Sequence, residues 1–144
     1  MKPVIGSFPR VNTADAPFLP PAQITLDWPL PPSNNNLNRP ARGSYYPTAA
    51  YKRWREAADA LSLAQMPKGG FQRINGAYEL LIVIDRRKLR ANADLGNREK
   101  AVSDNLQRSG FIENDKLAVR IVQEFGVAPE GARITIRSMG EHNG

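Results

Sequence analysis

Two aspartates, Asp94 and Asp115, are the residues of this chain best suited to metal chemistry. Carboxylates are hard oxygen ligands, and Mg²⁺ typically binds one or two of them together with water and phosphate oxygens. Lys100 follows Asp94 and supplies a cation that can neutralise charge developing on a phosphate. A second carboxylate close to Asp94 would make chemical sense, but Gly96 stands there. These residue types fit metal-assisted hydrolysis of a phosphodiester.

The same residues also fit ordinary structural roles. An aspartate at the start of a helix, such as Asp94, is very often only a cap. Asp115 follows Glu-Asn and precedes a lysine, which also suits a turn. Lys100 and Asp104 are spaced as a surface pair on a helix. Spacing alone therefore does not choose between catalysis and structure.

The positive charge of the chain is unevenly distributed. The formal net charge is +6 and the sequence pI is about 10.0. Residues 39–55 contain no acid and five basic side chains, which are Arg39, Arg42, Lys52, Arg53 and Arg55. In residues 86–90 every side chain except that of Leu89 is basic: Arg86, Arg87, Lys88 and Arg90. Such clusters suit a polyanion such as nucleic acid, because binding releases counterions, although a basic solvated surface has the same composition.

Composition excludes several other kinds of site. The chain has no cysteine, so disulfides and thiolate metal sites are ruled out, and this fits a reducing cytosol. A single histidine makes serine triads and His-ligated zinc unexpected. No apolar run approaches the roughly 18 residues of a membrane span, and no signal-peptide pattern is visible. We expect a cytoplasmic protein with no membrane partner.

Hydrophobic periodicity predicts one α/β domain. The order is β-α-β-α-β-β, with strands at residues 24–28, 78–84, 117–125 and 132–139 and helices at residues 49–64 and 94–108. Thr48 is the expected cap of the first helix, and a turn at residues 129–131 predicts that the last two strands form an antiparallel hairpin. Residues 78–84 should be a central strand covered on both faces, and residues 33–43 a polar loop. We divide the chain into a proline-rich arm (1–21), a domain (22–140) and a tail (141–144).

Several motifs in a fixed order resemble the RusA family of Holliday-junction resolvases, which are often phage or prophage endonucleases. They are Pro31-Pro32-Ser33-Asn34-Asn35, Arg39, Arg42-Gly43, Asp94-Leu95-Gly96-Asn97 with Lys100, and Ser109-Gly110-Phe111 with Asp115. The resemblance covers about residues 24–140. In the family the middle motif is Asp-x-Asp-Asn, followed by a lysine and a later aspartate. Gly96 occupies the position of the second aspartate and does not match.

The resemblance implies an α+β domain with a mixed sheet of about four strands and two main helices. It also implies a homodimer that cuts four-way DNA junctions in recombination and repair, with Mg²⁺ or Mn²⁺, in a bacterial or phage-infected cell. Asp94 and Asp115 would bind the metal, and Lys100 would stabilise the phosphate or position the water. Backbone phosphates would be contacted by Arg39, Arg42, Arg86, Arg87, Lys88 and Arg90.

The glycine at position 96 has three possible explanations. It is an inactivating substitution, a natural divergence toward weak or binding-only function, or a gap filled by another acid: Glu99, Asp104, Glu113 or Asp85. Glycine inside a helix costs about 1 kcal/mol relative to alanine, which favours a recent loss. We predict a chain that binds branched DNA and cleaves it slowly. The alternative is a non-catalytic branched-DNA-binding protein, while an RNA-binding domain lacks support from an aromatic stacking motif.

Overall fold

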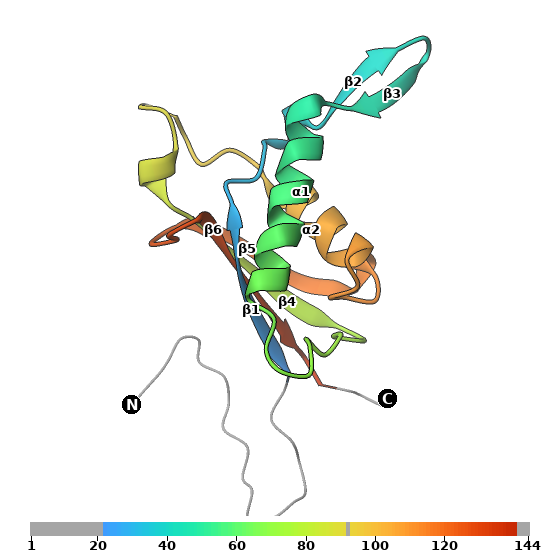
Figure 1. Cartoon of the computed structure of the whole chain (residues 1–144), viewed down its shortest axis with the longest axis vertical. Coiled ribbons are helices and arrows are strands. Elements are labelled where there is room, and N and C mark those ends of the chain that lie inside the picture. Colours follow the sequence, from blue (N-terminus) through green and yellow to red (C-terminus); the bar gives the residue numbers. More distant parts are fainter. Residues whose placement is uncertain (1–21, 92, 141–144) are drawn as a thin grey trace, which may run out of the picture.

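The structure is a computed structural model that describes residues 22–91 and 93–140 (Figure 1). The predicted arm at residues 1–21 and the tail at residues 141–144 lie outside the described residues. Within the described residues, no helix is long and apolar enough to cross a membrane.

One mixed sheet of four strands forms the body of the domain. In chain order the strands are β1 (Gln23–Pro29), β4 (Tyr78–Ile84), β5 (Ala118–Phe125) and β6 (Gly131–Ser138). Their order across the sheet is β1-β6-β4-β5, with β6 antiparallel to both of its neighbours and β4 parallel to β5. The predicted mixed sheet is therefore confirmed. The predicted hairpin between the last two strands is wrong, because β4 lies between β5 and β6.

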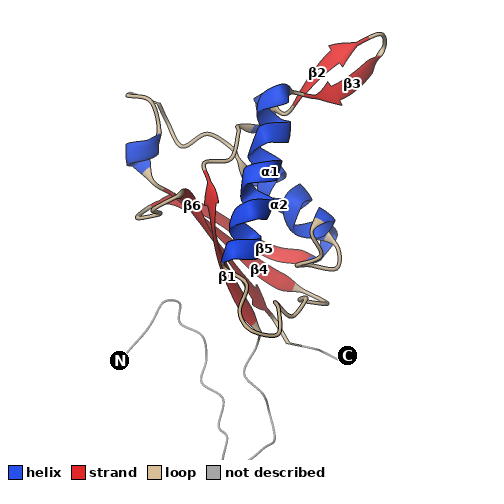
Figure 2. Cartoon of the chain, viewed as in Figure 1, coloured by secondary structure: helices blue, strands red, loops and turns tan. Residues whose placement is uncertain are grey.

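Two helices lie on the same face of this sheet (Figures 1 and 2). Helix α1 (Ala49–Ala64) has the predicted bounds, and the Thr48 side chain caps it by accepting a hydrogen bond from the backbone of Tyr51 at 3.1 Å. Helix α2 (Glu99–Arg108) connects β4 to β5. A helical crossover of this kind is what allows two consecutive strands to run parallel.

The core lies between the helices and the sheet. Alternate residues of β4 are fully buried: Tyr78, Leu80, Ile82 and Ile84. The Trp28 and Trp54 rings meet edge to face, with centroids 5.6 Å apart, and Trp28 Nε1 donates to Ser62 Oγ at 2.8 Å. Burial of each large side chain contributes about 1.5–3 kcal/mol, so this layer fixes the position of α1 on β1.

The opposite face of the sheet carries polar cross-strand pairs. Arg133 on β6 pairs with Asp27 on β1 at 2.8 Å, and Arg137 on β6 pairs with Glu79 on β4 at 2.5 Å. The β4 residues on this face are only partly buried. Strand β4 is thus central but covered on one face only, which corrects the expectation of two covered faces.

A short hairpin extends from the N-terminal end of α1, away from the sheet (Figure 1). It consists of β2 (Asn38–Ala41) and β3 (Ser44–Pro47), which are antiparallel, and it follows the 3₁₀ turn η1 (Asn34–Asn36). The expectation of a loop without strands at residues 33–43 is therefore wrong. Arg42 and Gly43 form the two-residue turn with φ of 51° and 78°. Positive φ at both positions is the geometry of a type I′ hairpin turn, which arginine rarely enters.

Candidate functional site

The loop before α2 contains the acidic motif. Helix α2 begins at Glu99, so the prediction of a helix from residue 94 is wrong. Gly96 has φ of 63°, a left-handed conformation that interrupts a right-handed helix and suits glycine. Arg98 is the N-cap of the helix, and Asn97, one residue earlier, accepts a hydrogen bond at its Oδ1 from the backbone of Glu99 at 3.2 Å. Gly96 therefore lies outside the helix, so it does not carry the cost of a helical glycine, and the preference for a recent loss based on that cost is wrong.

Two side chains from other elements hold this loop. Asn34 of η1 donates its backbone N–H to the carbonyl of Asn97 at 2.7 Å, and its Oδ1 accepts from the backbone of Lys100 at 3.1 Å. Gln123 of β5 accepts from the backbone of Arg98 at 3.0 Å and donates to the carbonyl of Gly96 at 2.5 Å. The loop is therefore fixed to both the turn η1 and the sheet.

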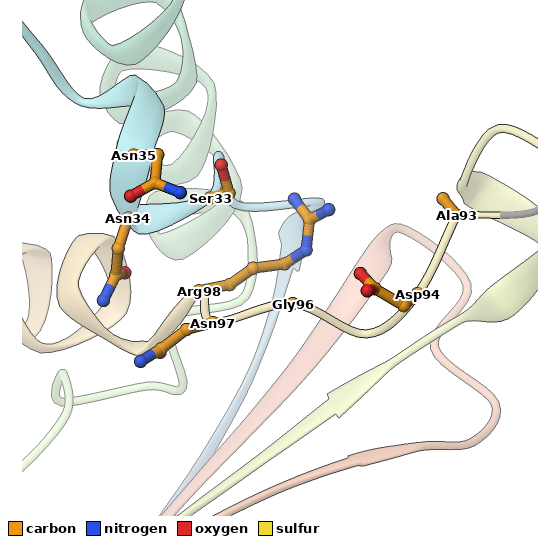
Figure 3. A pocket seen from close by; sticks show the side chains of 8 residues that line it. All are labelled: Ser33, Asn34, Asn35, Ala93, Asp94, Gly96, Asn97 and Arg98. Carbon is orange, nitrogen blue, oxygen red and sulfur yellow. The ribbon is translucent and has the colours of Figure 1, made fainter.

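These contacts enclose a pocket of about 640 Å³ between η1 and the loop (Figure 3). Its lining is mainly polar, and it consists of Ser33, Asn34, Asn35, Ala93, Asp94, Gly96, Asn97 and Arg98. Figure 3 shows the Asp94 carboxylate and the Arg98 guanidinium facing the same space. Asp94 thus borders a cavity, as a functional residue should.

Asp115 follows α2 in the chain, just before β5. It begins the 3₁₀ turn η3 (Asp115–Leu117), its backbone N–H donates to Gln107 Oε1 at 2.9 Å, and its carbonyl accepts from the Tyr78 hydroxyl at 3.4 Å. Burial of Tyr78, reinforced by the negative charges of Asp115 and Glu99, raises the pKa of the Tyr78 hydroxyl to about 12. Asp115 does not line the pocket beside Asp94, and its role as a metal ligand stays a prediction.

Lys100 forms the surface pair that its spacing indicates. Its Nζ lies 3.5 Å from Asp104 Oδ2, one helical turn along α2, and both side chains are exposed. An exposed pair of this kind contributes about 0.3–0.5 kcal/mol, so the lysine can leave it at little cost. Its predicted role at a phosphate is not tested by this contact.

The four acids considered as replacements for the missing carboxylate do not line the pocket, and each already has a partner. Ser103 donates to Glu99, Lys100 pairs with Asp104, the backbone of Gly76 donates to Glu113 at 3.2 Å, and Arg87 pairs with Asp85 at 2.7 Å. In this structure, therefore, none of these four acids takes the place of the missing carboxylate in the pocket.

The basic residues after β4 differ in the contacts that their side chains make. Arg87, in the turn η2 (Arg86–Lys88), makes two side-chain hydrogen bonds to buried Asp85. These bonds, followed by those from the backbones of Ala128 and Arg87, hold the pKa of Asp85 far below its usual range. Arg86 lies over the Phe125 ring, 3.9 Å from its centroid. All four basic side chains, Arg86, Arg87, Lys88 and Arg90, are exposed, and their contacts with DNA stay a prediction.

The hairpin presents a second basic surface, with aromatic residues that the sequence interpretation missed. Arg39 and Arg42 are exposed, as are Tyr45 (74%) and Tyr46 (47%). The register pairs Arg39 with Tyr46 on one face of the hairpin. The sequence did contain a signal for this hairpin, namely an arginine separated by a short turn from two β-prone tyrosines. It was missed because arginine is an unusual residue at such a turn.

Comparisons with known proteins identify the family. Residues 28–138 match the family described as Endodeoxyribonuclease RusA, which places the chain among DNA endonucleases. The chain is also 31% identical over 121 residues to a protein of Escherichia coli O139:H28 named Crossover junction endodeoxyribonuclease RusA. The match covers 82% of this chain and 95% of that relative. The chain therefore belongs to the RusA endodeoxyribonuclease family, which confirms the resemblance.

Membership of this nuclease family implies a divalent metal, but the pocket fits one poorly. Its lining includes one carboxylate, Asp94, and one guanidinium, Arg98, whose formal charges cancel. Among the described residues there is no group of three or more acids or histidines that could hold a metal ion. A divalent cation needs several oxygen ligands and net negative charge, and Gly96 contributes neither a ligand nor a charge.

Proposed function

We propose that this chain binds four-way DNA junctions as a member of the resolvase class and hydrolyses them slowly. The observation that carries this proposal is the loop of residues 93–98, which retains the family's framework around the pocket but has glycine at one acidic position. The framework supports recognition of DNA, because its supporting hydrogen bonds do not depend on the missing carboxylate. The depleted acidic set supports slow hydrolysis.

The residues of the chain can bind and orient the substrate without further groups. Exposed Arg39 and Arg42 on the hairpin, and Lys88 and Arg90 after β4, would contact backbone phosphates and supply affinity with little sequence information. Lys100 would exchange Asp104 for a phosphate near the start of α2. Arg86, which lies over the Phe125 ring, and Arg87, which is bonded to Asp85, are also exposed and would contact backbone phosphates from these fixed positions.

The assignment of Asp94 and Asp115 as ligands for Mg²⁺ or Mn²⁺ remains a proposal that needs a direct binding measurement. Titration of Mn²⁺, followed by the electron paramagnetic resonance signal of the free ion, measures this without catalysis. We expect weak binding by the unaltered chain and tighter binding by Gly96→Asp, since the variant adds a carboxylate beside Asp94. Equal, tight binding by both forms would contradict our account of position 96.

We further propose a homodimer, because a two-fold symmetric junction presents two equivalent cleavage positions to a two-fold symmetric protein. Sedimentation velocity of the free chain and of its junction complex tests this directly. A DNA substrate would place the protein in the cytoplasm of a bacterial or phage-infected cell, where recombination and repair occur. A monomer in both samples would contradict the dimer.

The proposed function is tested with a synthetic four-way junction and a linear duplex of matched length. We expect the chain to bind the junction more tightly than the duplex, and to cut it slowly when Mg²⁺ is supplied. Equal affinity for both DNAs would refute junction selectivity. The alternative, a non-catalytic branched-DNA-binding protein, is favoured by retained junction affinity with no cleavage, even after Gly96→Asp.

A further inference from the structure

Arg98 is the cation of the pocket, and its side chain is held in place by backbone groups. Its Nη1 donates to the carbonyl of Pro31 at 2.6 Å, and its Nε donates to the carbonyl of Leu95 at 3.2 Å. Neutral carbonyls orient a guanidinium without cancelling its charge. The Arg98 side chain is partly buried, and Figure 3 shows it extending toward the space between Ser33 and Asp94.

The remaining guanidinium N–H groups have no hydrogen-bond partner among the described residues. Asp94 forms no ion pair with Arg98 within 4.0 Å in this part of the chain, although its charge acts on the guanidinium. Burial lowers the pKa of Arg98 and Asp94 raises it, but an arginine keeps its charge at any physiological pH. The pocket therefore contains a fixed positive charge with donors to spare.

Apart from the Asp94 carboxylate, the polar groups around Arg98 are neutral and suit an anion. Ser33 and Asn35 bring a hydroxyl and an amide to the lining, whereas Asn97 Oδ1 already accepts from the backbone of Glu99. Asn34 is already committed through its backbone and its Oδ1, which keeps the wall of the pocket rigid. With Gly96 in place of an acid, no second carboxylate repels a phosphate from this space.

We propose that Arg98 binds a backbone phosphate of DNA in this pocket directly, without a bridging metal ion. The inference rests on the proposed function, and it gives the pocket of the unaltered chain a role in holding a phosphate. A planar guanidinium donates two parallel hydrogen bonds to a phosphate, and prior fixation of the side chain reduces the entropy lost on binding. The phosphate takes the place that the family reserves for an acidic, metal-holding group.

The test measures junction affinity in EDTA by fluorescence anisotropy over a series of salt concentrations. The variants are Arg98→Gln and Arg98→Lys, with Arg73→Gln as the control that removes the same charge from an exposed residue whose side chain donates to Asn75 Oδ1. We expect Arg98→Gln to weaken binding about 10- to 100-fold, the size of a lost charged hydrogen bond, and Arg98→Lys to weaken it less. The magnitude of the salt slope should fall by about 1 for Arg98→Gln and stay unchanged for Arg73→Gln.

The outcomes separate this inference from the proposed function. Equal affinities and salt slopes for Arg98→Gln and Arg73→Gln, with junction preference intact, would refute the Arg98 assignment alone. A requirement for Mg²⁺ in junction binding by the unaltered chain would also refute it. Loss of affinity in Arg98→Gln with full recovery of the salt slope in Arg98→Lys would support a direct phosphate contact, because misfolding would not be reversed by a second cation.

Discussion

Restoration of an acid by Gly96→Asp is the sharpest perturbation that the structure offers. Gly96 has φ of 63°, and a Cβ added there meets only Asp94 Oδ1, at 3.8 Å. The new side chain has room, but an L-residue in this conformation costs about 1–2 kcal/mol, with aspartate among those that tolerate it best. Repulsion between two carboxylates about 4 Å apart adds about 1 kcal/mol in water. The metal-free variant should therefore be about 2 kcal/mol less stable.

The thermal midpoint measures this balance. A loss of about 2 kcal/mol lowers Tm by roughly 5–8 °C in a domain of this size. A metal present at 100 times its Kd returns about 2.7 kcal/mol, so Mg²⁺ should raise the Tm of Gly96→Asp by a similar amount and leave the unaltered chain nearly unchanged. Junction cleavage by the variant should accelerate about 100-fold, a typical effect of one well-placed electrostatic group.

Gly69→Asp is the matched control, because Gly69 also has positive φ, at 91°, with nothing within 4 Å of an added Cβ. This control carries the backbone cost and the charge but lacks Asp94 as a neighbour. It should lose stability without gaining a response to Mg²⁺. The reasoning is refuted if Gly96→Asp shows no Mg²⁺-dependent rise in Tm, or if the unaltered chain cuts the junction as fast as the variant.

Three further predictions use the same protein. In metal-free buffer Gly96→Asp should bind the junction no more tightly than the unaltered chain, because it adds negative charge; tighter binding in a gel shift would contradict this. The double variant Arg39→Ala, Arg42→Ala should lower the salt slope of junction binding by about 2 with no change in Tm, since both residues are exposed. Tyr78 should ionise only near pH 12, as followed by phenolate absorbance. Because its pKa is raised on folding, its contribution to stability is complete below about pH 10 and lost toward pH 12, a loss absent in Tyr78→Phe.

Local patterns were sufficient for the elements that the core controls. The helix of residues 49–64 and the strand of residues 78–84 were predicted with their observed bounds, because a capped 3.6-residue period and a β-prone apolar run each have a single favourable solution. The start of α2 was wrong because Gly96 adopts a left-handed conformation that the letters do not reveal. The hairpin at β2 and β3 was missed because Arg42 enters positive φ at its turn.

Strand partners and the cation of the pocket depended on long-range contacts. The turn before β6 is real, with Gly131 donating to the carbonyl of Ala128 at 2.9 Å, yet β6 joins β1 and β4 and not β5. Arg98 falls within the helix predicted at residues 94–108, and no sequence motif singled it out. Its position became clear only through Pro31, which is 67 residues away in the chain. The family motifs singled out Asp94, which lines the pocket, but they carry no information on this arginine.

The central place of β6 in the sheet has a consequence for biosynthesis. Strand β1 pairs only with β6 among the described strands, so the first strand has no partner until nearly the whole domain has been translated. Until β6 is made, α1 can pack only against an incomplete sheet, so Trp28 and Trp54 should remain accessible to chaperones. Because contacts between distant segments slow folding, the domain should become resistant to protease only after Gly131–Ser138 has left the ribosome. A nascent chain arrested before this strand should therefore be degraded by protease, whereas one that includes it should be resistant.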